Sequence, residues 1–456
     1  MTWWSSHGRT VVTVAALWLV FNDPIDRWLP VPMPDLKPGP ATTWLAKPPL
    51  HEGRPDFAAA IDATDGERLV AGAAGWQALR QVMTEGGLAE AIAQHRKNQP
   101  SLIRGNPPSA DAASRERAPA LLALAQRLGS QPALAVPAKA HDESGSEPIL
   151  LLRAPDESSA LLLLAANCQQ VGSAAVVAGD AVNAMASADT LVRLSSLLAG
   201  IDDVASHAGA RRIRAQAYHL VVGSLATRIA DQAHRDEAAA FLRRWAPLPS
   251  ADAAFRRNAR LLTLRLITGL DRSLREGTTR GALAGLRTNY PPDVNDCLAR
   301  VNGWFDAADR ILPAVLDDAA LRAFAPDSLP VLDDPDQARL PLANTMLFNP
   351  PMTERRRAAA GWVAEDCVGV VTVGLSALGN AARADVHARK LLAHLLAVPA
   401  ALDPTAYAAA IRQRFGNSAD ASGFIEVTVD GGAVVIRPTS DVPGIAPLRI
   451  VLPSPP

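Results

Sequence analysis

Hydrophobic positions recur at helical spacing along most of the chain. Leu69, Trp76, Leu79 and Met83 lie three, four or seven residues apart and predict helix over about 56–98, with an interruption at Gly86-Gly87. Further helices are predicted for the run LLLLAANCQQV, which Ser158-Ser159 would cap, and for 180–198 and 202–245. Three more follow: a helix begun by Ser250, one that holds Cys297, Trp304 and Phe305, and one over 353–398. The sequence therefore predicts a mainly α protein, an irregular antiparallel bundle or array of helices.

The breaks between these patterns are rich in Pro, Gly and Ser. Residues 100–119 are predicted to form a loop, and a short helix over 121–128 to end at Gly129. The stretch 131–148, which contains AHDESGSEP, is predicted to be an exposed, mobile loop, followed by a lone strand over 149–153. A sub-boundary of the helical body is therefore placed near 129–156.

The C-terminal part changes period from helical to alternating. In GFIEVTVDGGAVVIR, which is 423–437, Ile425, Val427 and Val429 alternate with polar residues before Asp430-Gly431-Gly432 turns the chain. This pattern predicts a β-hairpin, with 448–452 as a possible third strand. So few strands need a partner surface, so we expect them to pack on the helix before them.

The N-terminal part holds one uncharged apolar segment. Thr10 to Phe21 spans only about 18 Å as a helix, against a hydrocarbon core of about 30 Å. An uncleaved membrane anchor over 1–29 fits best, because Arg9 precedes the segment, Asp23 and Asp26 follow it, and no small-residue cleavage site is present. A cleaved signal and a buried helix of a soluble protein are the alternatives.

Eight prolines follow between Pro30 and Pro55. Such a run favours extended polyproline II structure, and 30–55 is interpreted as a semi-rigid stalk that holds the body off a membrane. The alternative is an extended segment that lies across the body. The chain then divides into an anchor (1–29), a stalk (30–55), a helical body (56–422) and a β-hairpin with its tail (423–456).

Composition limits the class of partner. With 48% hydrophobic and 20% charged residues, the chain has the composition of a protein that folds around an apolar core. Its net charge of −1 gives no reason to expect nucleic acid as a partner. The preference for Arg over Lys is typical of a GC-rich bacterial genome. The short basic runs 211–214 and 355–357 are interpreted as solvated helix faces.

The motifs of the sequence predict no catalytic, cofactor-binding or metal-binding residue. No phosphate-binding glycine loop or zinc motif is present, and Cys168, Cys297 and Cys367 form no C-x-x-C pair; they are interpreted as buried small residues, or as one disulfide and a leftover thiol. His387 and His394 could share a helix face but lack further metal ligands. Ser376 lies in a loose match to a nucleophile elbow whose second glycine is one residue late.

Four groups of neighbouring acids contain the carboxyl groups that a general acid–base pair would need. In the pairs Asp202-Asp203 and Asp317-Asp318, Asp202 and Asp317 lie at predicted helix starts, where carboxylates cap backbone amides. Glu365-Asp366 lies inside a predicted helix. Asp333-Asp334-Pro335-Asp336 lacks the glycine and glutamate of a calcium loop. All four are interpreted as structural.

The layout resembles a loose group of bacterial envelope proteins with a short N-terminal anchor, a proline-rich stalk and a helical body. The stretches that carry the likeness are DPIDRWLPVPMP, NYPPDVNDCLARVNGWFDAADR and LPLANTMLFNPP. The group implies no activity, so no residue role is carried over from it.

These patterns together predict a single-pass protein of the bacterial inner membrane with its body in the periplasm. We expect it to act through protein–protein contacts, for example as a subunit of an envelope assembly. The alternatives are a cytoplasmic soluble protein and an enzyme, such as a hydrolase, whose site leaves no linear motif.

Overall fold

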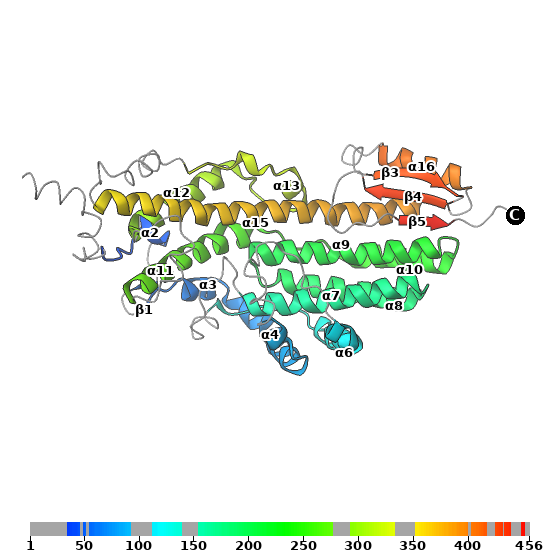
Figure 1. Ribbon diagram of the computed structural model, residues 1–456, viewed down its shortest axis with the longest axis horizontal. Coiled ribbons are helices and arrows are strands. Elements are labelled where there is room, and N and C mark those ends of the chain that lie inside the picture. The colour runs from blue at the N-terminus through cyan, green and yellow to red at the C-terminus, as the bar shows by residue number, and fades with distance from the viewer. Residues whose placement is uncertain are drawn as a thin grey trace, which may run out of the picture.

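The computed structural model describes residues 34–45, 49–51, 54–92, 112–138, 154–276, 292–332, 352–399, 403–416, 425–431, 433–438 and 448–451. Within these residues the protein is mainly α, as predicted (Figure 1). The predicted anchor (1–29), the predicted strand at 149–153 and the acidic run 333–336 lie outside them.

The helices and strands follow one another from α2 to β5. The helices are α2 (Pro40–Thr43), α3 (Phe57–Thr64), α4 (Gly66–Glu85), α6 (Ala112–Gly129), α7 (Pro155–Val177), α8 (Ala181–Ala199), α9 (Val204–Thr227), α10 (Gln232–Arg244), the π-helix η3 (Ala253–Ala259), α11 (Arg260–Glu276), α12 (Val294–Ile311), α13 (Asp318–Ala323), the 3₁₀ turn η5 (Pro326–Ser328), α15 (Met352–Ala397) and α16 (Pro404–Gly416). The strands are β1 (Leu50–His51), β2 (Arg54–Pro55), β3 (Ile425–Asp430), β4 (Ala433–Pro438) and β5 (Leu448–Val451).

Aspartates begin many of these helices. The side chains of Asp56, Asp180, Asp203, Asp231, Asp293 and Asp317 each accept a hydrogen bond from a backbone N–H of the first turn. Each bond satisfies an amide that the helix leaves without a partner, and the negative charge suits the positive end of the helix dipole. The predicted capping role is confirmed for Asp317 and wrong for Asp202, because the residue that caps α9 is Asp203.

Four predicted boundaries were wrong. The single helix predicted over 202–245 is two helices, α9 and α10, which are separated between Thr227 and Gln232. Pro119 lies inside α6 rather than in a loop, and α7 begins at Pro155, so Ser158-Ser159 sits inside the helix. Ser250 does not cap a regular helix: its hydroxyl contacts Asp252, and the chain continues as the π-helix η3. A proline fits the first turn of a helix because its missing N–H would have no partner there, which explains the early start at Pro155.

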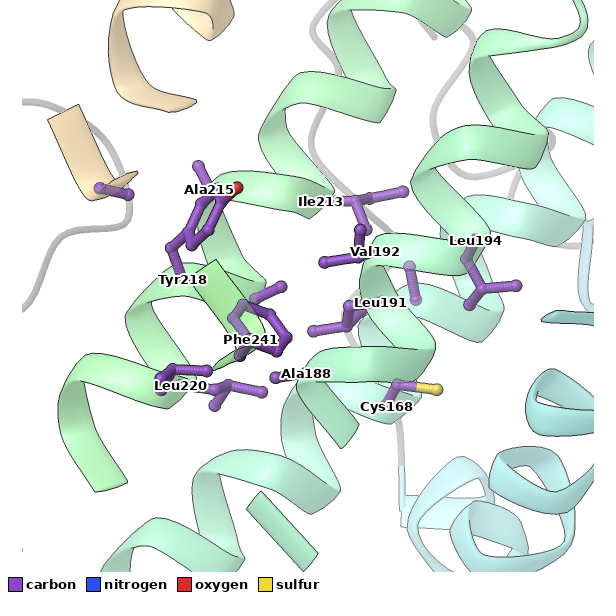
Figure 2. Packing of buried hydrophobic residues seen from close by; sticks show 14 of the residues in the cluster. Cys168, Ala188, Leu191, Val192, Leu194, Ile213, Ala215, Tyr218, Leu220 and Phe241 are labelled. Atoms are coloured by element: carbon purple, nitrogen blue, oxygen red, sulfur yellow. The ribbon is translucent and has the colours of Figure 1, made fainter. Parts of the chain in front are cut away.

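The helices enclose two apolar cores. The first core is built by the last part of α4, by α6, α7, α8 and α10, by most of α9, by the last third of α15, and by α16 and the C-terminal strands. Figure 2 shows its centre, where the rings of Tyr218 and Phe241 meet edge to face at 5.9 Å. The second core is built by α3, η3, α11, α12, α13 and the first part of α15. The 46-residue α15 runs through both cores along the length of the molecule (Figure 1).

The segment 133–138 is buried, so the predicted mobile loop at 131–148 is wrong for this part. Leu134, Ala135, Val136 and Ala138 are at most 2% exposed. The segment fits because α4 presents glycines to it: a Cβ on Gly72 would lie 2.2 Å from the Ala135 nitrogen. Leu128 before the segment and Leu161 after it belong to the same core, so the region near 129–156 does not separate two cores.

The C-terminal strands form an antiparallel sheet in the order β3-β4-β5, which confirms the predicted hairpin and third strand. The two-residue turn needs Gly431 in the left-handed region, at φ 56°. The Arg412 side chain of α16 donates to the Val427 carbonyl, so the sheet does pack on the preceding helix. Val434 and Ile450 are fully buried and join the first core.

Two helices, α7 and most of α15, are long and apolar enough to cross a membrane by length and composition alone. About half of each is buried among the other helices, as in the core of a globular protein. They are therefore weak evidence for a membrane span.

Candidate functional site

A buried polar layer separates the two cores. On α9, Val204 and Ala208 belong to the second core and Ala210 onward to the first; on α15 the change falls between Ala382 and Ala388. The polar layer is defined here as Asp65, Arg68, Asp202, His207, Arg211, Arg214, Arg257, Asn258, Asp318 and Asp385. It brings ionisable side chains from several helices together inside the described part of the protein, and is therefore the candidate site.

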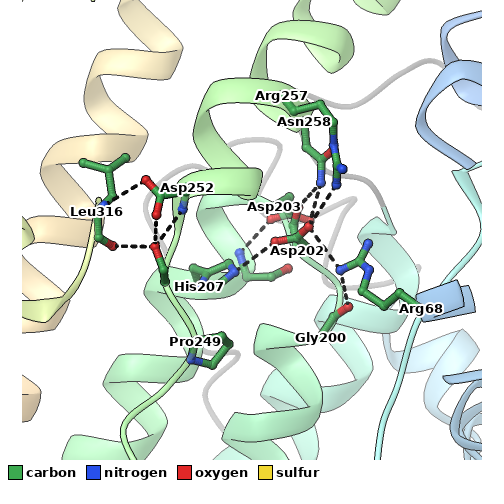
Figure 3. A network of polar contacts seen from close by, with 12 residues as sticks. Arg68, Gly200, Asp202, Asp203, His207, Pro249, Asp252, Arg257, Asn258 and Leu316 are labelled. Carbon is green, nitrogen blue, oxygen red and sulfur yellow. Dashed lines mark hydrogen bonds and ion pairs between the residues drawn. The ribbon is translucent and has the colours of Figure 1, made fainter. Parts of the chain in front are cut away.

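Asp202 is the centre of one half of the layer (Figure 3). Its carboxylate accepts a hydrogen bond from Asn258 Nδ2 at 3.0 Å and pairs with Arg68 at 3.1 Å. Arg68 and Arg257 also pair with Asp65, at 2.5 and 2.7 Å, so two guanidinium groups bridge two carboxylates. The arginine side chains are 31% and 22% exposed, and the layer reaches solvent at this point.

Two backbone irregularities build this half. Asp202 adopts φ 64°, a left-handed conformation that non-glycine residues seldom take. Arg257 and Asn258 lie in the π-helix η3, whose wide turn brings the Arg257 Nε to 2.9 Å from the Asn258 Oδ1. Such features cost energy and often mark functional sites. Here the two irregular segments meet at Asn258, whose side-chain amide also donates a hydrogen bond to the Asp202 carbonyl at 2.7 Å.

His207 joins the two halves of the layer. Its Nε2 lies 3.3 Å from Asp202 Oδ1, and its Nδ1 lies 3.3 Å from an Arg211 nitrogen. A guanidinium only donates hydrogen bonds, so Nδ1 accepts and Nε2 carries the proton that is donated to Asp202. Both ring nitrogens are thus used within the layer, and the side chain is 1% exposed. His207 therefore has no free nitrogen with which to act as a general base on a substrate.

Arg211 and Arg214 form the other half of the layer. Arg211 Nε donates to Asp318 at 3.0 Å, and Arg214 Nε donates to both oxygens of Asp385 at 3.0 and 2.9 Å. The interpretation of the run 211–214 as a solvated helix face is therefore wrong: Arg211 is fully buried and Arg214 is 3% exposed. In the run 355–357, Arg356 is also buried, at 8% exposure.

The Arg214–Asp385 pair is held as an ion pair. Burial is the largest influence on both groups and raises the pKa of Asp385 above its ordinary value. Burial opposes the charge on Arg214 as well, but the hydrogen bonds and charge of Asp385 outweigh it and raise the pKa of the guanidinium. Since a guanidinium is charged at any physiological pH, the pair joins α9 to α15 electrostatically.

A second constellation has the order of a nucleophile, a base and an orienting acid. Ser224 Oγ lies 3.0 Å from His234 Nε2, and His234 Nδ1 lies 3.5 Å from Glu237. Ser224 is 1% exposed and sits inside α9, where the backbone amides serve the helix. An acyl-transfer site needs free amides to stabilise an oxyanion and access for a carbonyl group, and this position offers neither.

The candidate nucleophile and metal ligands considered in the sequence analysis lie outside the polar layer. Ser376 is inside α15 and donates to the Thr372 carbonyl, so the strand and turn of a nucleophile elbow are missing. The three cysteines are free and buried, which agrees with the first of their two interpretations and not with a disulfide. Burial raises the pKa of the Cys168 and Cys367 thiols to about 12. His387 and His394 both lie on α15, and among the described residues no three His, Cys, Asp or Glu side chains gather as metal ligands.

The polar layer was missed because its members come from five separate elements. One signal was present: His207, Arg211, Arg214 and Tyr218 follow one another at steps of four, three and four residues, the period of one helix face. The neighbouring residues on that face are small or apolar, which indicates burial rather than exposure.

Comparison of the chain with protein-family models, with characterised proteins and with solved structures finds no significant match.

Proposed function

We propose that this protein is a membrane-attached helical scaffold of the bacterial envelope that acts through protein–protein contacts. The observation that carries the proposal is the polar layer: its charged groups pair with one another between the two cores. Such a layer fixes the relative position of α9, α15 and η3, and its charged side chains are occupied by these pairings. Together with the continuous α15, it makes the body a stiff, elongated unit, which suits a spacer or an assembly subunit.

The end of the molecule formed by the α7–α8 turn supports a contact role. Val177 is 90% exposed and Val182 is 75% exposed, on either side of Gly179. A photo-reactive residue at Val177 should give one discrete cross-linked product in cells, and the charge introduced by Val182→Glu should abolish it. The same residue at His51, at the other end of the body, is the matched control. A product that survives Val182→Glu, or none at all, would count against a contact at this end.

Membrane attachment is tested separately on the full chain. We expect it to stay in the membrane pellet after alkaline carbonate extraction. The double variant Ala16→Arg/Leu17→Arg should release it, because each arginine costs about 2.5–3.5 kcal/mol at the centre of a membrane helix. Release of the unaltered chain by carbonate would remove the anchor from the proposal.

An acyl-transfer enzyme is the alternative, and the Ser224–His234–Glu237 contacts are the observation in its favour. A fluorophosphonate probe labels an activated serine, so labelling of the unaltered chain that disappears in Ser224→Ala would establish the enzyme. We expect no labelling, because Ser224 is buried within a helix.

A further inference from the structure

Residues 34–45, here called the strap, lie against the second core instead of standing away from the body. Leu36 and Leu45 pack on that core, and Thr43 in the short helix α2 is fully buried. The prediction of a free stalk over 30–55 is therefore wrong for this part. The other possibility drawn from the sequence, an extended segment that lies across the body, describes it.

Two asparagines on one face of α12 bind the strap backbone. Asn295 accepts a hydrogen bond from the Lys37 N–H at 2.8 Å and donates to the Asp35 carbonyl at 3.0 Å. Asn302, two turns further along α12, donates to the Ala41 carbonyl at 2.9 Å. A carboxamide can accept and donate at once, so Asn295 pairs with the strap as a neighbouring strand would.

An arginine clamp fixes the end of the strap. The Arg260 guanidinium lies 4.7 Å from the centre of the Trp44 ring and 5.8 Å from that of Phe305. The guanidinium is held by Asn302 Oδ1 at 2.9 Å and by Asp306 at 2.7 Å. A cation seated over an aromatic face contributes about 0.5–2 kcal/mol. Arg260 itself is 1% exposed.

The strap leaves the body at one end of the long axis. Arg275, in the last turn of α11, donates to the Pro34 carbonyl at 2.6 Å. Figure 1 shows α2 beside the starts of α12 and α15, at the opposite end from α16 and the C-terminal sheet. The 46 residues of α15 cover about 69 Å between these ends.

We propose that the α11–α12 surface is a docking site for the chain's own strap, and that the docked strap turns this end of the body toward the membrane. This inference rests on the proposed membrane attachment. The chain from Phe21 to Pro34 reaches at most about 45 Å, so the docked strap keeps the α11–α12 end near the membrane. Release of the strap as far as Pro49 would add about 50 Å of chain and loosen that orientation.

Energy transfer from a labelled cysteine to an acceptor lipid tests the orientation. One label is placed through Leu50→Cys at the strap end and the other through Val177→Cys at the far end, positions that are 57% and 90% exposed. The native cysteines do not compete, because all three are buried. The full chain is reconstituted into vesicles of phosphatidylethanolamine and phosphatidylglycerol and recovered by flotation.

We expect at least about twofold higher transfer from residue 50 than from residue 177, since the length of α15 separates the two ends. The double variant Asn295→Ala/Trp44→Ala should reduce this difference by at least about half, because the free chain then reaches about twice as far. Asn380→Ala/Trp245→Ala is the matched control, since it removes an asparagine and an arginine-bound tryptophan away from the strap, and should leave the difference unchanged.

Equal transfer from the two positions in floated protein would overturn the orientation while the membrane attachment stands. So would an unchanged difference in the strap variant. Protein that fails to float would remove the attachment and the orientation together. If the double variant loses helical signal, Asn295→Ala alone replaces it, because the bonds of its carboxamide run to the strap.

Discussion

Arg211 and Arg214 are among the least exposed side chains of the described residues, and their charge determines what they contribute. A buried ion pair adds little net stability over a well-packed apolar pair, because desolvation of the two charges offsets their attraction. Removal of one partner alone is costly, since the other charge stays buried without compensation. The pairs of the polar layer therefore specify which helix faces meet more than they stabilise the fold.

Arg214→Leu is expected to lower the free energy of unfolding by about 3–5 kcal/mol, because Asp385 then stays buried without its partner. The double variant Arg214→Met/Asp385→Leu should regain most of this loss. Urea unfolding followed by circular dichroism measures both. Arg244→Leu is the control: its pair with Asp189 is about half exposed on the arginine side, and the expected loss is at most about 1 kcal/mol. A double variant as unstable as Arg214→Leu would contradict this account.

His219 makes stability depend on pH. Burial lowers the pKa of His219 from 6.5 to about 4. Because the pKa of His219 is lower in the folded state than in the unfolded state, its contribution to the free energy of unfolding is fully present above pH 6.5. The contribution is lost as the pH falls toward 4, because in this range the unfolded chain binds a proton at His219 and the folded chain does not. We expect a loss of roughly 2 kcal/mol over this range, after allowance for its partial exposure.

His219→Gln isolates this contribution, because glutamine does not titrate. Urea midpoints of the variant, measured at several pH values between about 7 and 4, should fall less steeply than those of the unaltered protein. Parallel pH profiles would show that His219 takes up its proton normally in the folded state.

At the scale of elements, close backbone approach decides how α4 meets the segment 133–138. A Cβ on Gly75 would lie 2.0 Å from the Ala133 carbonyl oxygen, and one on Gly200, at the end of α8, would lie 2.4 Å from the Leu134 carbonyl oxygen. Both contacts are with backbone, which cannot turn aside as a long side chain can. Glycine is therefore needed at these positions for space rather than for a special φ angle.

Gly72→Ala is expected to destabilise the protein by about 1–3 kcal/mol, because the added methyl group must displace the backbone at Ala135. Helix propensity alone would predict a gain of about 1 kcal/mol. Gly369→Ala is the matched control, since it lies within α15 where a Cβ would meet nothing within 4 Å. It should raise the thermal midpoint while Gly72→Ala lowers it; a rise in both would refute the close approach.

At the scale of the whole molecule, α9 and α15 connect two cores that the polar layer would otherwise separate. Both helices carry residues of each core, so neither core keeps its full set of contacts when the other unfolds. This continuity, together with the ion pairs of the polar layer, gives the body the stiffness that a scaffold requires.

Hydrogen exchange followed by mass spectrometry should therefore show similar protection in α8 of the first core and α12 of the second. In the variant Asp202→Asn the protection of α8 and that of α12 should differ from each other. The reason is that residue 202 then has no negative charge with which to pair with Arg68 and Arg257 between the two cores. Asparagine also accepts a left-handed backbone, so the substitution leaves φ unstrained. Equal protection of the two helices in the variant would indicate that the polar layer does not couple the cores.

The sequence by itself determined the features that depend on neighbouring residues. The helices over 180–198 and 353–398, the aspartate cap at Asp317 and the hairpin at Asp430-Gly431 all follow from hydrophobic period and local hydrogen bonding, and they were predicted. The mainly α class followed from the same signals. Membrane attachment belongs to this level too, and stays a prediction.

Only the tertiary structure decided which polar residues face inward. Arg214 meets Asp385 across 171 residues of sequence, and Asn295 meets Lys37 across 258. An arginine on a helix carries the same local signal whether its partner is water or a distant carboxylate. The burial of the run 211–214, the docking of the strap and the course of the segment 133–138 therefore required the packed fold.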